Sequence, residues 1–133
     1  MNNKLTLHND INDVTRLGEW IEETGESIEI APDKIFNINL ALEEVVVNII
    51  NYAYPDQTGM PIYIDMDYRD GVITYTITDE GLPFDPTLHD NPDTTLSAEQ
   101  RPIGGLGIML ARRLSTSMTY HRSEGKNILT IKF

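Results

Sequence analysis

The sequence predicts an α+β fold, a two-layer α/β sandwich with helices on one face of a mostly antiparallel sheet. Strand-like alternation of apolar and polar residues occurs in two neighbouring pairs, at 62–77 and at 118–133, with turn signals at Asp70-Gly71 and Glu124-Gly125. Three other segments carry apolar residues at helical spacing. Antiparallel hairpins combined with separate helices are typical of an α+β domain.

A short strand and a helix begin the chain. Residues 5–7 alternate apolar and polar side chains, and Asn9 or Asp10 is a suitable N-cap for the helix that follows. The apolar residues of this helix recur at three- and four-residue steps: Ile11, Val14, Leu17 and Ile21. Thr24-Gly25 is its expected end.

A second, longer helix is expected from Pro32 to about Tyr54, where Pro55 ends it. At about 100° per residue its apolar side chains share one arc, which is the expected core face. These side chains are Ile35, Ile38, Leu42, Val45, Val46 and Ile49.

The opposite side of this helix carries a narrow polar stripe: Asn37, Glu44, Asn48 and Asn51. Asparagine is a poor helix former, so a requirement other than helix stability is indicated. An amide oxygen suits Mg²⁺, and a carboxylate one turn away can orient or deprotonate a nucleophile. The simpler alternative is a solvated helix face with some interhelical hydrogen bonds.

The alternation of the second predicted strand, at 73–77, places Asp79 on its apolar side. A carboxylate there needs hydrogen-bond donors, and the exocyclic amine of adenine is one. Gly81 would let a ligand approach the backbone closely. The simpler alternative is a strand-end Asp that begins a turn.

A glycine cluster follows a long polar loop. Residues 83–102 are rich in Pro, Asp, Asn, Thr and Ser, and such a loop is usually functional or disordered. The cluster Gly104-Gly105-Leu106-Gly107 then opens a third helix to about Ser115. Glycines let backbone amides face a phosphate, the helix N-terminus adds partial positive charge, and Arg101 lies close enough in sequence to contribute. The alternatives are a flexible hinge and a surface arginine, and the pattern is neither a P-loop nor a Rossmann fingerprint.

Length and composition indicate a single domain over residues 1–133. The net charge of -11 argues against binding to nucleic acid or to an anionic membrane surface, because both depend on Lys and Arg. The chain has no cysteine, which removes disulfides and thiolate metal sites. It also has no long apolar segment at its start, so a cytoplasmic location is expected.

These motifs resemble those of the Bergerat fold, the histidine-kinase-like ATP-binding domain shared by the gyrase, chaperone and histidine-kinase superfamily. Glu44 with Asn48 looks like its N box, Asp79-Glu80-Gly81 like its first glycine box, and Gly104–Gly107 like its second. Within the superfamily the chain is most similar to bacterial anti-sigma-factor serine/threonine kinases, most specifically from Leu40 to Leu110.

The resemblance implies that the chain is a protein serine/threonine kinase that binds ATP and Mg²⁺. Asn48 would hold the metal, Asn51 would help to bind the cofactor, and Glu44 would act as general base on a serine or threonine of a partner. Asp79 would read the adenine amine, and Gly81 would sit beside the base.

The phosphate end would be formed by Gly104, Gly105, Leu106 and Gly107 with Arg101. The loop over 87–103 would be an ATP lid.

The resemblance also implies partners: a sigma factor or similar regulator that is bound, a small antagonist protein that is phosphorylated, and a second copy in a homodimer. Tyr52 stands where the family often has His, and Thr116 where an Asp often follows the third helix. Both departures concern the partner surface.

Three other functions compete with this one. They are a nucleotide-binding switch that sequesters a partner without kinase activity, a detached histidine-kinase catalytic domain, and an acidic protein-interaction domain that binds no nucleotide.

Overall fold

Five strands form one sheet in the order β1-β2-β3-β5-β4, and every pairing between them is antiparallel. The computed structural model describes residues 2–88 and 105–133. The strands are β1 (Asn2–His8), β2 (Pro61–Arg69), β3 (Val72–Asp79), β4 (Ser117–Ser123) and β5 (Lys126–Lys132). The hairpin of β4 and β5 pairs with the hairpin of β2 and β3 through β5 and β3. This pairing unites segments far apart in the chain in a single sheet.

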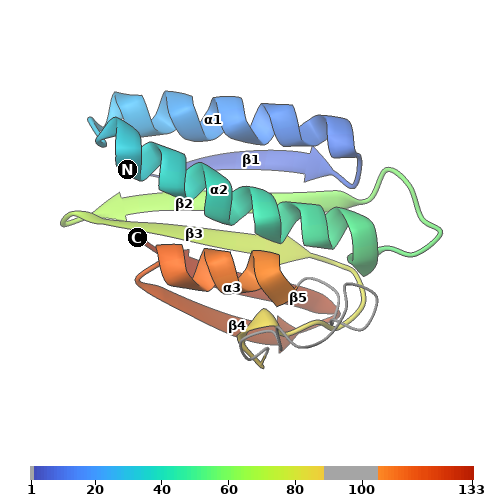
Figure 1. Ribbon diagram of the computed structural model, residues 1–133. Coiled ribbons are helices and arrows are strands. Elements are labelled where there is room, and N and C mark those ends of the chain that lie inside the picture. The colour runs from blue at the N-terminus through green and yellow to red at the C-terminus, as the bar shows by residue number, and fades with distance from the viewer. Residues whose placement is uncertain (1, 89–104) are drawn as a thin grey trace.

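Three α-helices cover one face of this sheet, with α2 between α1 and α3 (Figure 1). They are α1 (Val14–Ser27), α2 (Pro32–Asn48) and α3 (Gly105–Leu114). Shorter helical segments are η1 (Ile11–Asp13), η3 (Pro86–Leu88) and the π-helix η2 (Ile49–Ala53), which continues α2. The predicted two-layer α+β sandwich is confirmed. In the described ranges, no helix combines the length and apolarity needed to cross a bilayer.

The core lies between the helices and the covered face of the sheet. The strands β2 and β3 alternate as predicted, and their buried apolar residues are Ile62, Ile64, Met66, Ile73, Tyr75 and Ile77. Tyr75 makes edge-to-face contacts with Trp20 of α1 and Phe133 at the C-terminus, with ring centroids 6.1 and 5.9 Å apart. Such pairs stabilise a core beyond the burial of their area.

The two candidate N-caps of the first helix have separate tasks. The Asp10 side chain accepts a hydrogen bond from the Asn12 amide at 2.9 Å and caps η1. Asn9 instead bonds the loop before β2, since its side chain donates to the Gln57 carbonyl and accepts from the Met60 amide. Asp10 is therefore the cap, and Asn9 fastens the start of the helical layer to the sheet.

The predicted end of the first helix at Thr24-Gly25 is wrong, because α1 continues to Ser27. The Thr24 hydroxyl donates to the carbonyl of Trp20 within the helix, at 2.7 Å. Gly25 is buried where α1 meets α2, and a Cβ on it would lie 2.9 Å from two carbon atoms of Ile35. The glycine thus permits close helix packing instead of ending the helix.

We expect opposite effects from two Gly-to-Ala substitutions in α1. Gly18→Ala should raise the free energy of unfolding by about 0.5–1 kcal/mol, because its Cβ would meet Asn39 at an ordinary 3.5 Å and the helix loses a flexible residue. Gly25→Ala should lower it by about 1 kcal/mol, because overpacking against Ile35 outweighs the same gain. Urea titration of both variants tests this, and equal stabilisation by both would contradict the packing role of Gly25.

Candidate functional site

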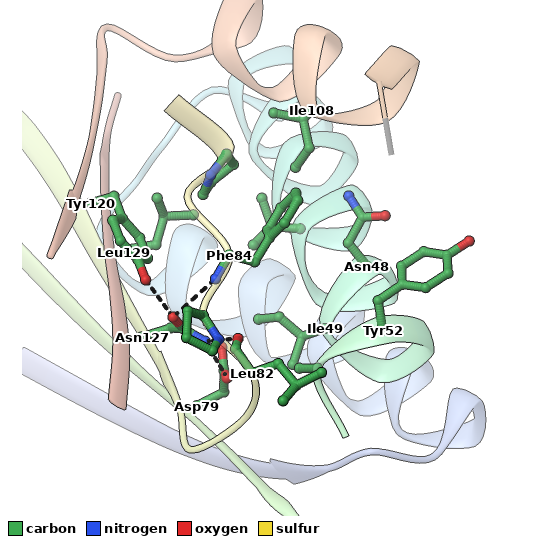
Figure 2. A pocket seen from close by; sticks show the side chains of 14 residues that line it. Asn48, Ile49, Tyr52, Asp79, Leu82, Phe84, Ile108, Tyr120, Asn127 and Leu129 are labelled. Atoms are coloured by element: carbon green, nitrogen blue, oxygen red, sulfur yellow. Dashed lines mark hydrogen bonds between the residues drawn. The ribbon is translucent and has the colours of Figure 1, made fainter. Parts of the chain in front are cut away.

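A pocket of about 310 Å³ opens between the C-terminal part of α2, η2, the turn after β3 and the C-terminal hairpin (Figure 2). Most of its lining is apolar, with Val45, Ile49, Ile108 and Leu129 among its walls. A few polar groups converge on it: Asn48, Asp79, Tyr120 and Asn127. A mostly apolar cleft with a few placed polar groups is typical of a small-molecule site.

Asp79 ends β3 and is 4% exposed, so the prediction that it turns inward is confirmed. Its Oδ1 accepts hydrogen bonds from Asn127 Nδ2 at 2.9 Å and from the Gly81 amide at 2.8 Å. Burial raises the pKa of this carboxyl group, while these two hydrogen bonds and the nearby charge of Arg122 act to lower it. The site therefore holds a carboxylate that burial disfavours and that selected donors stabilise.

Asn127 was not predicted as a site residue. Its side-chain nitrogen donates to Asp79 and to the Leu82 carbonyl, and its oxygen accepts from Tyr120, Arg122 and Phe84. Extending the apolar alternation of the last strand back from Leu129 would have placed Asn127 on the covered face. Its proximity to Asp79, by contrast, follows from the pairing of β3 with β5, in which the two residues are opposite each other.

Gly81 has a close neighbour within the protein. A Cβ on Gly81 would overlap the carbonyl oxygen of Ala53 and lie 2.6 Å from its Cβ. The Leu82 amide also donates to this Ala53 carbonyl at 2.9 Å. The close contact between this turn and η2 thus explains the glycine at position 81. Contact of Gly81 with a ligand stays a prediction.

The polar stripe of the second helix divides at the start of the π-helix. Asn48 lines the pocket, and its Nδ2 is buried with no hydrogen-bond partner among the described residues. Asn51 is exposed and does not line the pocket, whereas Tyr52 does. A π-helix bonds each residue to the fifth one along and so turns less per residue than an α-helix, which carries Asn51 away from the stripe. A binding role for Asn51 stays a prediction.

Glu44 lies beside the pocket, where α2 meets the first turn of α3. A Cβ on Gly107 would overlap Glu44 Oε2 and lie 3.2 Å from Glu44 Cδ. The carboxylate is therefore packed over Gly107. Gly105 and Leu106 begin α3, while Arg101, Gly104 and most of the predicted lid at 87–103 lie outside the described residues.

The structure thus brings Asn48 and Asp79 to one pocket and Glu44 to the start of α3. Within residues 2–88 and 105–133, no three His, Cys, Asp or Glu side chains come together as a metal site. The unpaired Nδ2 of Asn48 is a hydrogen-bond donor that fits an acceptor oxygen of a ligand, because a buried polar atom is normally hydrogen-bonded.

Sequence comparison relates the chain to ATPase domains of kinases. A profile of the histidine kinase-like ATPase domain family matches residues 7–133. The chain is similar to the serine/threonine-protein kinase BtrW of Bordetella bronchiseptica, with 27% identity over 112 residues, which cover 84% of this chain and 79% of that protein. It is also similar to blue-light-activated histidine kinase 1 of Erythrobacter litoralis, with 28% identity over 105 residues, or 78% of this chain and 26% of that kinase.

Among solved structures, the RsbU and RsbW domains of a Mycobacterium tuberculosis protein share this fold, with a TM-score of 0.71 and 17% identity. The match covers 99% of this chain and 32% of that one. The chain therefore spans about four fifths of the Bordetella kinase, but only about a quarter and a third of the other two proteins.

Replacing Asp79 by Asn should stabilise the fold increasingly as the pH rises. The pKa of Asp79 is raised above its ordinary value of 3.8, chiefly by burial. Between the two pKa values the folded chain keeps a proton that the unfolded chain has released, so this group's contribution to the free energy of unfolding falls with rising pH. An asparagine does not ionise, and its oxygen still accepts from Asn127 and Gly81.

Urea titrations of wild type and Asp79→Asn from about pH 4 to about pH 8 cover this range. The free energies of unfolding should diverge in favour of the variant as the pH rises. A difference that is constant across the range would contradict a raised pKa.

Proposed function

The chain belongs to the histidine kinase-like ATPase domain family, and from this premise we propose that it binds ATP with Mg²⁺ and transfers the γ-phosphoryl group to a serine or threonine of a partner protein. The observation that carries the proposal is the pairing of two groups in one pocket. These are the buried carboxylate of Asp79 and the unpaired buried amide of Asn48. A hydrogen-bond acceptor and a second polar group in an apolar cleft suit a purine nucleotide.

Asp79 would bind the base. Its Oδ1 already accepts two hydrogen bonds from the protein, and the exocyclic amine of adenine would donate to the carboxylate from the pocket. The apolar side chains of Ile49, Ile108 and Leu129 would pack on the faces of the base. A guanine carbonyl at the same position would meet a carboxylate without a proton between them, which disfavours GTP.

The phosphates would lie toward the start of α3. Asn48 would hold Mg²⁺, which when bound neutralises charge on the phosphate oxygens. Gly104, Gly105, Leu106 and Gly107, with Arg101, would bind the phosphates through backbone amides and one guanidinium group. The unpaired Nδ2 of Asn48 supports phosphate binding at this end, because it can donate to a phosphate oxygen, while the amide oxygen would be the ligand of the metal.

Glu44 would act as the general base. In the transfer, the hydroxyl oxygen of the partner forms a bond to the γ-phosphorus, its proton passes to Glu44, and the bond from the γ-phosphorus to the bridging oxygen breaks to release ADP. The contact of Glu44 with Gly107 supports this role, because it puts the carboxylate beside the turn proposed to hold the phosphates. Such a reaction depends mainly on positioning and charge stabilisation.

We further propose that the chain regulates a protein partner. The resemblance to anti-sigma-factor kinases supports a sigma factor or similar regulator as the bound partner, a small antagonist protein as the phosphoryl acceptor, and a homodimer. A relative named as a serine/threonine-protein kinase, matched over most of its length, supports the choice of acceptor residue.

One observation favours an alternative, a nucleotide-binding switch that sequesters a partner without kinase activity. Glu44 is packed over Gly107 and does not line the pocket. A general base must be within hydrogen-bond reach of its proton, and a displacement of about 1 Å can lower a rate by about a hundredfold. Nucleotide binding at Asp79 and phosphoryl transfer by Glu44 are therefore separable.

Asp79→Asn should weaken ATP binding about tenfold to a hundredfold. The asparagine oxygen keeps its contacts with Asn127 and Gly81, so its NH₂ group faces the adenine amine and the hydrogen bond to that amine is lost. Calorimetric titration with ATP and Mg²⁺ measures the affinity, and a smaller rise in melting temperature on ligand addition supports it. Asp67→Asn, on β2, is the matched control and should bind as wild type does. Equal affinity of Asp79→Asn and wild type would count against the whole site.

Glu44→Gln should bind ATP normally and lose phosphoryl transfer by at least about a hundredfold, since it removes the general base and keeps the size of the side chain. Glu43→Gln makes the same change on an exposed neighbouring residue of α2 and should transfer at the wild-type rate. The measurement follows radiolabelled phosphate from ATP to any small candidate antagonist protein encoded beside this chain. If wild type binds ATP but labels no such protein, the kinase proposal is wrong and the switch remains.

A further inference from the structure

We propose that Asn127 is a positioning residue that makes the pocket selective for purines carrying an exocyclic amine at C6, by holding the Asp79 carboxylate in one orientation. This inference rests on the proposed binding of ATP. It assigns the selectivity to a residue outside the resembling motifs, on the strand β5 that pairs with the strand of Asp79.

The Asn127 side chain is a buried amide with partners on both ends. It is 6% exposed and lines the pocket. Its Nδ2 donates to Asp79 Oδ1 at 2.9 Å and to the Leu82 carbonyl at 2.7 Å. Both hydrogens of the amide are therefore used on the wall of the pocket (Figure 2).

The other end of the amide determines its orientation. Asn127 Oδ1 accepts from the Tyr120 hydroxyl at 2.5 Å, from Arg122 at 3.1 Å and from the Phe84 amide at 3.4 Å. Rotating the amide by half a turn would set its NH₂ group against donors and its oxygen against the acceptors Asp79 and Leu82. The network therefore permits one orientation, with the NH₂ group toward Asp79.

This orientation leaves one oxygen of Asp79 for a ligand. The Gly81 amide donates to the same Oδ1 atom as Asn127, at 2.8 Å. All hydrogen bonds between the described residues and this carboxylate end on Oδ1, so Oδ2 is available as an acceptor. A ligand amine can donate to Oδ2, whereas a ligand that presents only acceptors there cannot.

Asn127 also favours the charged form of Asp79. Its NH₂ group donates to the carboxylate and acts to lower the pKa of Asp79, against the effect of burial. A protonated carboxyl group would accept from a ligand amine more weakly than the carboxylate does. Positioning and charge thus act in the same direction, toward recognition of an amine.

The test compares ATP with purine riboside triphosphate, which lacks the exocyclic amine, by calorimetric titration in Mg²⁺. Wild type should prefer ATP by at least about tenfold. Asn127→Asp keeps the shape and the accepting oxygen but replaces the NH₂ group by a second carboxylate oxygen. Its affinity for ATP should fall about tenfold or more, and its preference for ATP should fall below about threefold.

Two further variants make the result decisive. Tyr120→Phe leaves Asn127 and Asp79 in place and removes one donor that orients the amide, so the preference for ATP should fall in the same direction by a smaller factor. It decides the matter if Asn127→Asp does not fold by circular dichroism. Asn12→Asp makes the same chemical change in η1, away from the pocket, and should keep the wild-type preference.

The outcomes separate the inference from the function on which it rests. A wild type that does not bind ATP overturns the proposed function and this inference with it. ATP binding with an unchanged preference in both Asn127→Asp and Tyr120→Phe overturns the inference alone. Equal losses of affinity for the two nucleotides do the same, because they indicate a merely structural role.

Discussion

The site depends on the antiparallel pairing of β3 with β5, which sets Asp79 opposite Asn127 at the edge of the core. The two residues are 48 positions apart, and the hydrogen bond between them joins the end of β3 to the start of β5. Because side chains alternate along a strand, a slip of one residue in this pairing would turn Asn127 to the open face. The buried carboxylate would then lose its side-chain donor. The register of the sheet therefore determines the electrostatics of the pocket.

A second set of contacts joins the turn after β3 to the end of η2, through one main-chain hydrogen bond and one hydrogen bond to the Tyr54 side chain. The Ala53 carbonyl accepts from the Leu82 amide at 2.9 Å, and the Tyr54 hydroxyl accepts from the Glu80 amide at 2.6 Å. No side chain fits at Gly81 between these contacts. The end of η2 and the turn after Asp79 are therefore one packed unit. These contacts hold the backbone after Asn48 against the backbone after Asp79, and so limit how far apart the two side chains can lie.

Local patterns in the sequence predict the parts of the site that local rules govern. Alternation along a strand turned Asp79 inward, and helical spacing separated the core arc of α2 from its polar stripe. Gly25 was misread because a glycine at a helix crossing and a glycine at a helix end look alike without the partner helix. Asn51 does not lie on the predicted stripe because a π-helix changes the angle per residue, and no local sequence pattern predicts the π-helix. Asn127 escaped notice because its function arises from the pairing of distant strands.

The proposed function requires an acidic chain, with net charge -11, to bind a polyanionic ligand despite charge repulsion. The two ends of the site differ in how they meet this requirement. At the base end the ligand is neutral, so a buried carboxylate repels no charge and can act as a selective acceptor. At the phosphate end the proposed groups are two dipoles, an amide and a helix N-terminus, with the single guanidinium group of Arg101. Arg112 and Arg113 lie in the last turn of α3, away from its glycines. Dipoles and a metal ion attract phosphate without a basic surface that would also attract nucleic acid. Affinity then rests on a few oriented groups, and the hydrogen bonds that orient them matter as much as the groups themselves.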